Sequence, residues 1–128
     1  MFPNQRMLNK LIEIANSSEC MHKMSCIITD RKNNVLSHSP NLLKSHPYQS
    51  KLAKKVGLDK KIYLHAETAN ICRIKNKSKA YRAYIIRVTK HGLGMSRPCP
   101  VCRLALEMAG IKEIVYSVNY NKFMVENI

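Results

Sequence analysis

The sequence predicts an α/β fold built on one mixed sheet of four to five strands, in which the last strand runs antiparallel to its neighbour. Stretches with helical spacing of apolar residues alternate with short β-branched runs, in the order α-β-β-α-β-α-β-β. The length of 128 residues suits one domain with one core. Only ten residues follow Val118, too few for a helical crossover and a further parallel strand.

The first half of the chain is predicted to form a helix followed by a hairpin. Apolar residues recur at helical spacing over 4–17, and this helix is expected to begin at Pro3 or Asn4. Residues 25–29 have the β-branched density of a buried strand. Turn-forming residues then precede a second strand at 35–38, so we expect the two strands to pair as a hairpin.

The second half continues the alternation of helix and strand. The expected elements are a short helix at 49–56 within the Pro-, Ser- and Lys-rich segment 39–61, a helix at about 65–75, a strand at 83–88, a loop through Gly92 and Gly94, a helix at about 99–109, a strand at 112–118 and a further strand at 122–126. Gly110 is expected to end the helix at 99–109 as its C-cap.

The composition is typical of a protein that stays in a reducing compartment. No apolar run approaches the roughly 18 residues that span a bilayer, and residues 1–6 lack the apolar stretch of a secretory signal. Five cysteines, an odd number, fit poorly with a disulfide framework. We therefore expect a cytoplasmic protein without membrane contact, in which closely spaced cysteines bind metal or take part in catalysis.

The formal net charge of +14 is large for a chain of this length. Such a surface attracts polyanions, of which nucleic acid is the commonest. A compositional bias toward Lys, Asn and Ile, as an AT-rich genome produces, explains the charge equally well. Charge alone therefore identifies no ligand.

Two short motifs bring together residue types that bind zinc: His-Ala-Glu at 65–67 and Pro-Cys-Pro-Val-Cys at 98–102. Zn²⁺ accepts imidazole and thiolate, and three protein ligands leave the fourth tetrahedral position open to water. Cys99 and Cys102 are three residues apart at the start of a predicted helix, so they share one face. Helix N-termini carry partial positive charge, which favours thiolates. The spacing predicts a zinc site made of His65, Cys99 and Cys102.

Glu67 is the predicted catalytic residue. It lies two residues after His65, about 200° around a helix, and is therefore poorly placed as a further ligand. It is better placed beside the open zinc position, where it can take a proton from bound water and deliver it to a substrate. The alternative is a closed zinc site that only stabilises the fold, but such a site normally has four protein ligands and leaves Glu67 without a role.

The combination H-x-E…P-C-x-x-C, with each motif opening a helix, resembles the cytidine deaminase superfamily. The order of elements is similar over nearly the whole chain, which implies a three-layer α/β/α cytidine-deaminase-like fold. The resemblance implies Zn²⁺ as the cofactor, held by His65, Cys99 and Cys102. Glu67 is then the proton shuttle in the hydrolysis of an exocyclic amine. Residues 46–67 are also similar to small phage-encoded deaminase-like proteins.

Three residues are expected to contact the substrate. By resemblance to the family, the backbone N–H of Ala66 contacts the base, and Asn41 matches an asparagine that family members commonly use on the sugar. His46 lies in the loop expected to border the site, where it can touch a phosphate or a base; an exposed loop histidine is the alternative. Members of this size often form dimers or tetramers, so a homo-oligomer is also expected.

Other residues near the motifs leave alternatives open. The pattern C-x-H-x₃-C at 20–26 fits part of a second metal site, although Cys26 is expected to face the core from its strand. Arg87, Arg97 and Arg103 lie near the predicted zinc site, and one of them is a candidate for binding a substrate phosphate.

Three functions stay open at this point. The preferred one is deamination of cytosine in a cytidine or deoxycytidine nucleotide or nucleoside, and the second is deamination of a base within single-stranded DNA or RNA. The third, a non-catalytic zinc-containing nucleic-acid-binding module, is disfavoured by the presence of Glu67. A histidine as first ligand resembles the nucleotide and nucleic-acid branches, whereas the antiparallel tail resembles the free-nucleoside branch. Adenine is the weaker choice of base, because tRNA adenosine deaminases with these motifs usually carry a C-terminal helix.

Overall fold

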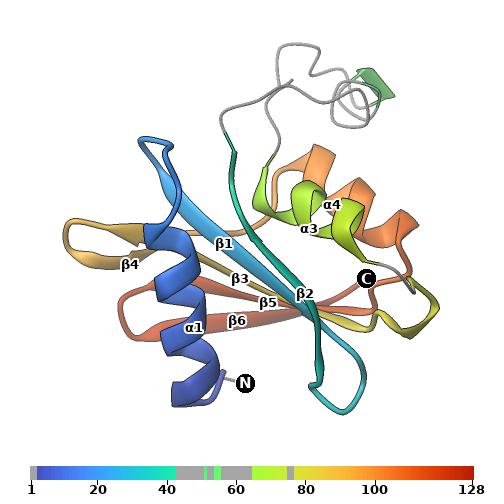
Figure 1. Ribbon diagram of the computed structural model, residues 1–128, viewed down its shortest axis with the longest axis horizontal. Coiled ribbons are helices and arrows are strands. Elements are labelled where there is room, and N and C mark those ends of the chain that lie inside the picture. Colours follow the sequence, from blue (N-terminus) through green and yellow to red (C-terminus); the bar gives the residue numbers. More distant parts are fainter. Residues whose placement is uncertain (1–2, 43–50, 52–53, 56–64, 75–76) are drawn as a thin grey trace.

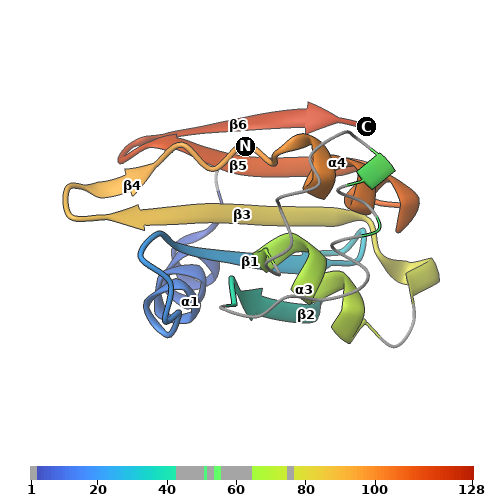
Figure 2. The ribbon, with the colours of Figure 1, turned by 90° about the horizontal axis from the view of Figure 1, so that it is seen from above.

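The computed structural model describes residues 3–42, 51, 54–55, 65–74 and 77–128. It shows a mixed sheet of six strands with helices on both of its faces (Figure 1). The strand order is β2-β1-β3-β5-β6, and β4 pairs with β3. Figure 2 shows these strands side by side, with β4 beside one end of β3. The three-layer α/β/α fold is therefore confirmed.

The observed elements match the predicted order. Their bounds are Gln5–Asn16 (α1), Lys23–Thr29 (β1), Val35–Pro40 (β2), Ala66–Arg73 (α3), a 3₁₀ turn at Lys77–Lys79, Arg82–Thr89 (β3), Gly92–Gly94 (β4), Pro100–Met108 (α4), Glu113–Asn119 (β5) and Lys122–Asn127 (β6). Strands β3 and β5 are parallel, and the other pairs are antiparallel. The antiparallel last strand is confirmed, because Lys122–Asn127 returns along β5. Of the helix predicted at 49–56, positions 51, 54 and 55 are helical, and the rest lies outside the described residues.

Side chains alternate between the two faces of the sheet and form two apolar clusters. On one face, Ile27 of β1 and Ile86 of β3 pack with Leu11 and Ala15 of α1. On the other face, residues such as Ile28 pack with α3 and α4. This alternation follows from the period of two residues along a strand, and it gives each helix layer its own half of the core.

Helix α4 ends as the sequence predicts. Gly110 has a φ of 87°, and its N–H donates to the Glu107 carbonyl at 3.1 Å. The next N–H, of Ile111, donates to the Leu106 carbonyl at 3.0 Å. This pair of hydrogen bonds is a Schellman motif, which favours glycine because it needs the left-handed conformation. The chain then enters β5, parallel to β3.

The loop predicted through Gly92 and Gly94 is instead strand β4, which pairs with the end of β3. The sheet therefore has six strands, whereas four or five were predicted. A three-residue strand with two glycines shows no alternation of apolar and polar side chains, so its sequence carries no strand signal. Strand β5 pairs with β3 over 82–85, whereas β4 pairs with it over 87–89. The parallel strands β3 and β5 therefore separate, and β4 lies along β3 where β5 has left it.

Two buried serines close the junction where β3 and β5 separate. The Ser96 Oγ donates to the Ile85 carbonyl of β3 at 2.9 Å, and the Ser96 N–H donates to the Ser117 carbonyl of β5 at 2.9 Å. The Ser117 Oγ in turn donates to the Gly94 carbonyl of β4 at 2.7 Å. The segment that leads into α4 is thus fixed to three strands at once.

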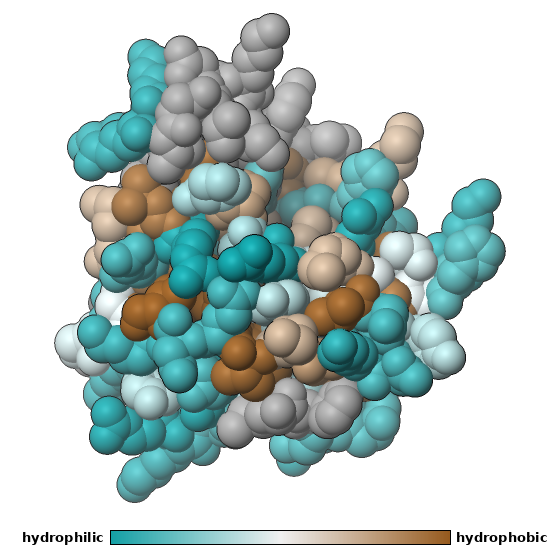
Figure 3. All heavy atoms as spheres, turned by 180° about the vertical axis from the view of Figure 1, so that it is seen from behind, coloured by the Kyte–Doolittle hydropathy of each residue, from teal (hydrophilic) through white to brown (hydrophobic). Residues whose placement is uncertain are grey.

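Figure 3 shows the side of the molecule behind the one in Figure 1, where hydrophilic side chains interrupt the apolar patches. Strand β6 forms an edge of the sheet and exposes parts of Met124 and Val125. No helix in the described part of the chain is long and apolar enough to cross a membrane.

Candidate zinc site

The N-termini of α3 and α4 carry the predicted metal ligands. His65 is the N-cap residue of α3, and Cys99 is the N-cap residue of α4, where Pro100 occupies the first helical position. Proline suits that position because its missing N–H would have no partner within the helix. Cys102 follows on the first turn of α4. Both helices lie on the same face of the sheet and pack against each other, so their N-termini converge.

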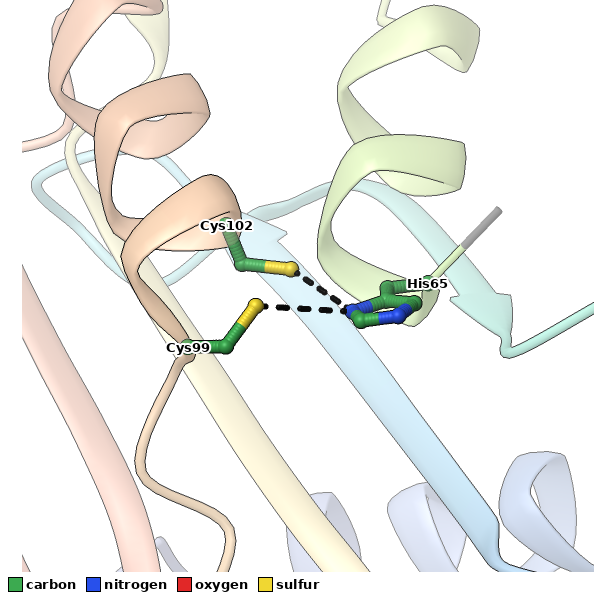
Figure 4. Close-up of side chains that lie close together, drawn as sticks. All are labelled: His65, Cys99 and Cys102. Atoms are coloured by element: carbon green, nitrogen blue, oxygen red, sulfur yellow. Dashed lines mark hydrogen bonds between the residues drawn. The ribbon is translucent and has the colours of Figure 1, made fainter. Parts of the chain in front are cut away.

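The three side chains point toward one another (Figure 4). His65 Nδ1 lies 3.1 Å from the Cys102 Sγ and 3.7 Å from the Cys99 Sγ. All three candidate ligand atoms lie within 4.8 Å of one another. Tetrahedral zinc with ordinary bond lengths places nitrogen and sulfur ligands about 3.6 Å apart. The nitrogen and the two sulfurs therefore fit a zinc ion with small adjustments.

The charge state of the two cysteines also suits a cation. The hydrogen bond with Cys102 and that with His65 lower the pKa of the Cys99 thiol to about 3, so this sulfur is a thiolate at neutral pH. The hydrogen bond to Cys99 and burial raise the pKa of the Cys102 thiol. Two sulfurs at the positive end of one helix hold negative charge readily, and a bound cation stabilises the second thiolate as well.

Glu67 adds a buried carboxylate beside these ligands. Its side chain is on the first turn of α3 and only 2% exposed. Burial raises the pKa of its carboxyl, and the charge of His65 opposes this effect. One of its oxygens, Oε1, is buried without a hydrogen-bond partner among the described residues. An unsatisfied buried oxygen costs about 1–3 kcal/mol. Its presence here indicates a position that a water molecule or a substrate completes.

Asn70 fixes α3 to the sheet one turn after Glu67. Its Nδ2 donates to the Cys26 carbonyl of β1 at 2.8 Å, and its Oδ1 accepts from the hydroxyl of Ser37 on β2. All three residues are buried. A helix held to two strands at this point keeps the first turn, and with it Glu67, in a fixed position.

Two of the three zinc ligands, His65 and Cys99, border a pocket of about 260 Å³. His65, Glu67 and Cys99 form one wall. The remaining lining residues come from the start of β1, from the end of β3 and from the segment before α4: His22, Met24, Arg87, Met95 and Arg97. The pocket thus combines a buried carboxylate, two sulfur-containing apolar side chains and two arginines.

The structure places the other predicted residues in different ways. Ala66 is buried at the first position of α3, where its N–H has no acceptor within the helix. The Asn41 amide holds the backbone at the start of β1: Oδ1 accepts from the Met24 N–H at 3.1 Å, and Nδ2 donates to the His22 carbonyl at 2.6 Å. Asn41 therefore supports the pocket wall, and its contact with a sugar stays a prediction. His46 lies outside the described residues.

The second metal site considered at 20–26 does not form. Within the described ranges, the only group of potential ligands close enough to hold a metal is that of His65, Cys99 and Cys102. Cys26 is fully buried in the core, as expected from its strand position. His22 instead accepts a hydrogen bond from Arg87 at 2.9 Å, on the rim of the pocket.

Comparison with known proteins agrees with this site. A family model described as the cytidine and deoxycytidylate deaminase zinc-binding region matches residues 1–118. The chain belongs to this family. The matched region is the zinc-binding region of the family, and it contains His65, Cys99 and Cys102. Together these findings identify Zn²⁺ as the cofactor.

The deaminase fold is also found by structural comparison. Cytidine deaminase from Burkholderia pseudomallei has a similar crystal structure, with a TM-score of 0.65 and 13% sequence identity. The match covers 98% of this chain and 93% of that chain. At so low an identity, the likeness shows a shared fold. A search of curated protein sequences finds no match.

Sequence analysis did not predict that His22 and Met24 line the pocket, and it left the role of Arg87 open. His22 was considered only for a second metal site, and the sequence gave no signal for Met24, which lines the pocket through the register of β1 with β3, where it lies opposite Arg87. Arg87 did carry a signal. It continues the inward-facing row of Ala83 and Ile85 on β3, and a charged residue in such a row needs a special environment.

Proposed function

We propose that the protein is a hydrolytic deaminase that converts cytosine to uracil in a cytidine or deoxycytidine nucleotide or nucleoside. The observation that carries the proposal is the buried Glu67, whose unpartnered Oε1 lies beside the three zinc ligands and at the wall of an open pocket. A carboxylate oxygen in this position, with no hydrogen-bond partner among the described residues, is placed to move protons.

The cofactor and the protein have separate roles in the reaction. Zinc held by His65, Cys99 and Cys102 would act as a Lewis acid that makes water nucleophilic near neutral pH. Glu67 accepts a proton from the attacking water. As the water oxygen bonds to C4 of cytosine and the C4–N bond breaks, the two water protons end on the ring nitrogen N3 and on the departing ammonia. Glu67 carries them there, and the backbone N–H of Ala66 contacts the base.

Cytosine is preferred to adenine on the basis of the family. The matching family model is described by cytidine and deoxycytidylate deaminases, and the similar crystal structure is that of a cytidine deaminase. The small pocket of about 260 Å³ suits one pyrimidine base with part of its sugar.

The test is ammonia release by zinc-loaded protein offered cytidine, deoxycytidine, dCMP and a cytosine-containing single-stranded oligonucleotide. We expect turnover of a monomer, and a loss of at least about 10²-fold for Glu67→Gln with zinc content unchanged. Glu107→Gln, which removes an exposed carboxylate from α4, is the matched control. Silence across the panel with zinc bound, or full activity of Glu67→Gln, would refute the proposal.

Deamination of cytosine within single-stranded DNA or RNA is a second candidate. The net charge of +14 favours it, as does a neighbouring pocket of about 500 Å³ that Lys23, Lys90 and His91 help to line. Turnover of the oligonucleotide alone, with a steep dependence on salt, would favour this candidate over the monomer.

A further inference from the structure

Arg87 occupies an unusual position for a charged residue. On β3, Ala83 and Ile85 face α3 and α4 within the core, and Arg87 is the next residue on the same face. It therefore extends past the buried part of the sheet and lines the zinc pocket together with Glu67. Its neighbour across the β3–β4 pair is Gly94, which presents no side chain over it.

The charge of Arg87 has no counterion among the described residues. Arg97 and Arg103, the other arginines near the site, both pair with Glu126 at 2.9 and 3.1 Å. Arg87 makes instead a hydrogen bond from Nη2 to the His22 ring, and its buried Nε has no hydrogen-bond partner. A guanidinium with an unsatisfied donor at the wall of a pocket is suited to bind an anion from that pocket, because planar, paired donors match phosphate geometry.

Two pockets meet at this residue. The zinc pocket and the neighbouring pocket of about 500 Å³ share Arg87 and His22 as lining residues. The second pocket is also lined by Lys23, Lys90 and His91. Among the described residues, a ligand whose base enters the zinc pocket therefore meets Arg87 and the neighbouring basic side chains Lys23 and Lys90 where it leaves that pocket on the side of His22.

We propose that Arg87 binds a phosphate group of the substrate, supported by His22, so that this deaminase acts on phosphorylated cytosine compounds in preference to free nucleosides. The proposal rests on the proposed function, because it names the substrate class of the same pocket. The phosphate is either the terminal group of a nucleotide or a backbone group of a single strand.

Binding measured without turnover tests this proposal. Zinc-loaded protein carrying Glu67→Gln is titrated calorimetrically with deoxycytidine, with dCMP and with a short cytosine-containing oligonucleotide. We expect dCMP or the oligonucleotide to bind about 10- to 100-fold more tightly than deoxycytidine, which is the usual effect of a charge-assisted contact. Adding Arg87→Gln should bring the ratio close to one. The phosphorylated ligand that loses this advantage identifies the source of the phosphate.

Two further variants keep the result interpretable. Arg31→Gln removes the same charge from an exposed position in the turn between β1 and β2, and should leave the affinity ratio intact. Arg87→Lys, which keeps the charge but not the paired donors, should retain part of the ratio. Two results would overturn the proposal: equal affinities for phosphorylated and free ligands in the Glu67→Gln protein, or an affinity ratio that does not change when Arg87→Gln is added.

These titrations, together with the ammonia assay of the zinc-loaded parent protein, separate this proposal from the proposed function. An Arg87-dependent preference for phosphate in a protein that releases no ammonia would leave the phosphate site standing and reject deamination. Turnover of free deoxycytidine as readily as dCMP would do the reverse.

Discussion

The residues that precede α1, α3 and α4 have the same extended backbone, but their side chains have different roles. Asn4 precedes α1 with an extended backbone, and its side chain accepts a hydrogen bond from the Met7 N–H at 2.8 Å. His65 and Cys99 hold the same position before α3 and α4, also with extended backbone, but their side chains make no capping hydrogen bond. They point at each other across the zinc site instead (Figure 4). A helix start can therefore stabilise its own N–H groups or present a ligand, and the second choice forgoes about 1 kcal/mol for each helix.

The largest expected effect is on metal content. Cys99→Ser replaces a ligand by a good capping residue, and we expect the affinity for zinc to fall by more than about 100-fold. Asn4→Ala, the corresponding change at α1, should leave zinc content at that of the parent protein. Metal analysis after dialysis against a weak chelator measures both. Full zinc occupancy in Cys99→Ser would show that the sulfur is not a ligand.

A smaller effect is expected at the ordinary cap. Asn4→Ala removes the acceptor for the Met7 N–H, and should lower the free energy of unfolding by about 1 kcal/mol. Urea unfolding followed by circular dichroism measures the change. Asn9→Ala, an exposed change within the same helix, is the control and should cost less. An equal effect of the two variants would mean that the cap contributes nothing.

The comparison also predicts a change of stability at α4. In metal-free protein at neutral pH, Cys99→Ser supplies the missing capping oxygen but removes the thiolate that Cys102 and His65 stabilise, so the free energy of unfolding should fall below that of the metal-free parent. With zinc present, the difference should grow, because only the parent gains from binding. Unfolding curves of the two proteins, each with and without chelator, give both differences. A metal-free variant more stable than its parent would show that the cap outweighs the thiolate.

The smallest effect concerns how α4 is positioned without a side-chain cap. Glu126 on β6 accepts hydrogen bonds from Arg97 before the helix, from Arg103 on its first turn and from the Tyr116 hydroxyl. The bonds from Tyr116 and Arg97 lower the pKa of Glu126 to about 2. Since the pKa is lower in the folded protein than its ordinary value near 4.5, this stabilisation is present above that value and is lost as the pH falls toward 2.

Glu126→Gln measures this contribution. The variant should be less stable than the parent at pH 6 by no more than about 1 kcal/mol, because the cluster is partly exposed and salt screens it. The difference should shrink steadily between pH 4.5 and pH 2 in urea unfolding. A difference that does not change with pH would assign the effect to packing and not to charge.

Much of the fold follows from local patterns in the sequence. The apolar spacing over α1, the β-branched runs of β1 and β3, and the glycine that ends α4 each reflect a single element, so they can be interpreted without tertiary structure. The zinc ligands were predicted for a related reason, because each motif is local. His-Ala-Glu at 65–67 and Pro-Cys-Pro-Val-Cys at 98–102 each combine zinc-binding residue types at the start of a predicted helix.

The remaining features depend on contacts between distant segments. Strand β4 exists because the end of β3 offers a free edge, which no pattern within Gly92–Gly94 encodes. The contact of Asn41 with a sugar stays a prediction from resemblance. The hydrogen bonds of its amide to the backbone of His22 and Met24 could not be predicted, because they depend on how β2 pairs with β1. His22 enters the pocket for the same reason. Such roles become visible only when the strands are paired.

Strand β4 also belongs to a hairpin that is separate from the helices carrying the zinc ligands. The zinc ligands and Glu67 lie at the starts of α3 and α4, whereas the hairpin of β3 and β4 contributes Arg87 to the wall of the pocket. Insertions or deletions in this exposed hairpin would reshape the entrance and leave the ligands in place. Exchanging this hairpin between relatives is thus expected to change the entrance of the pocket while the zinc ligands keep their positions.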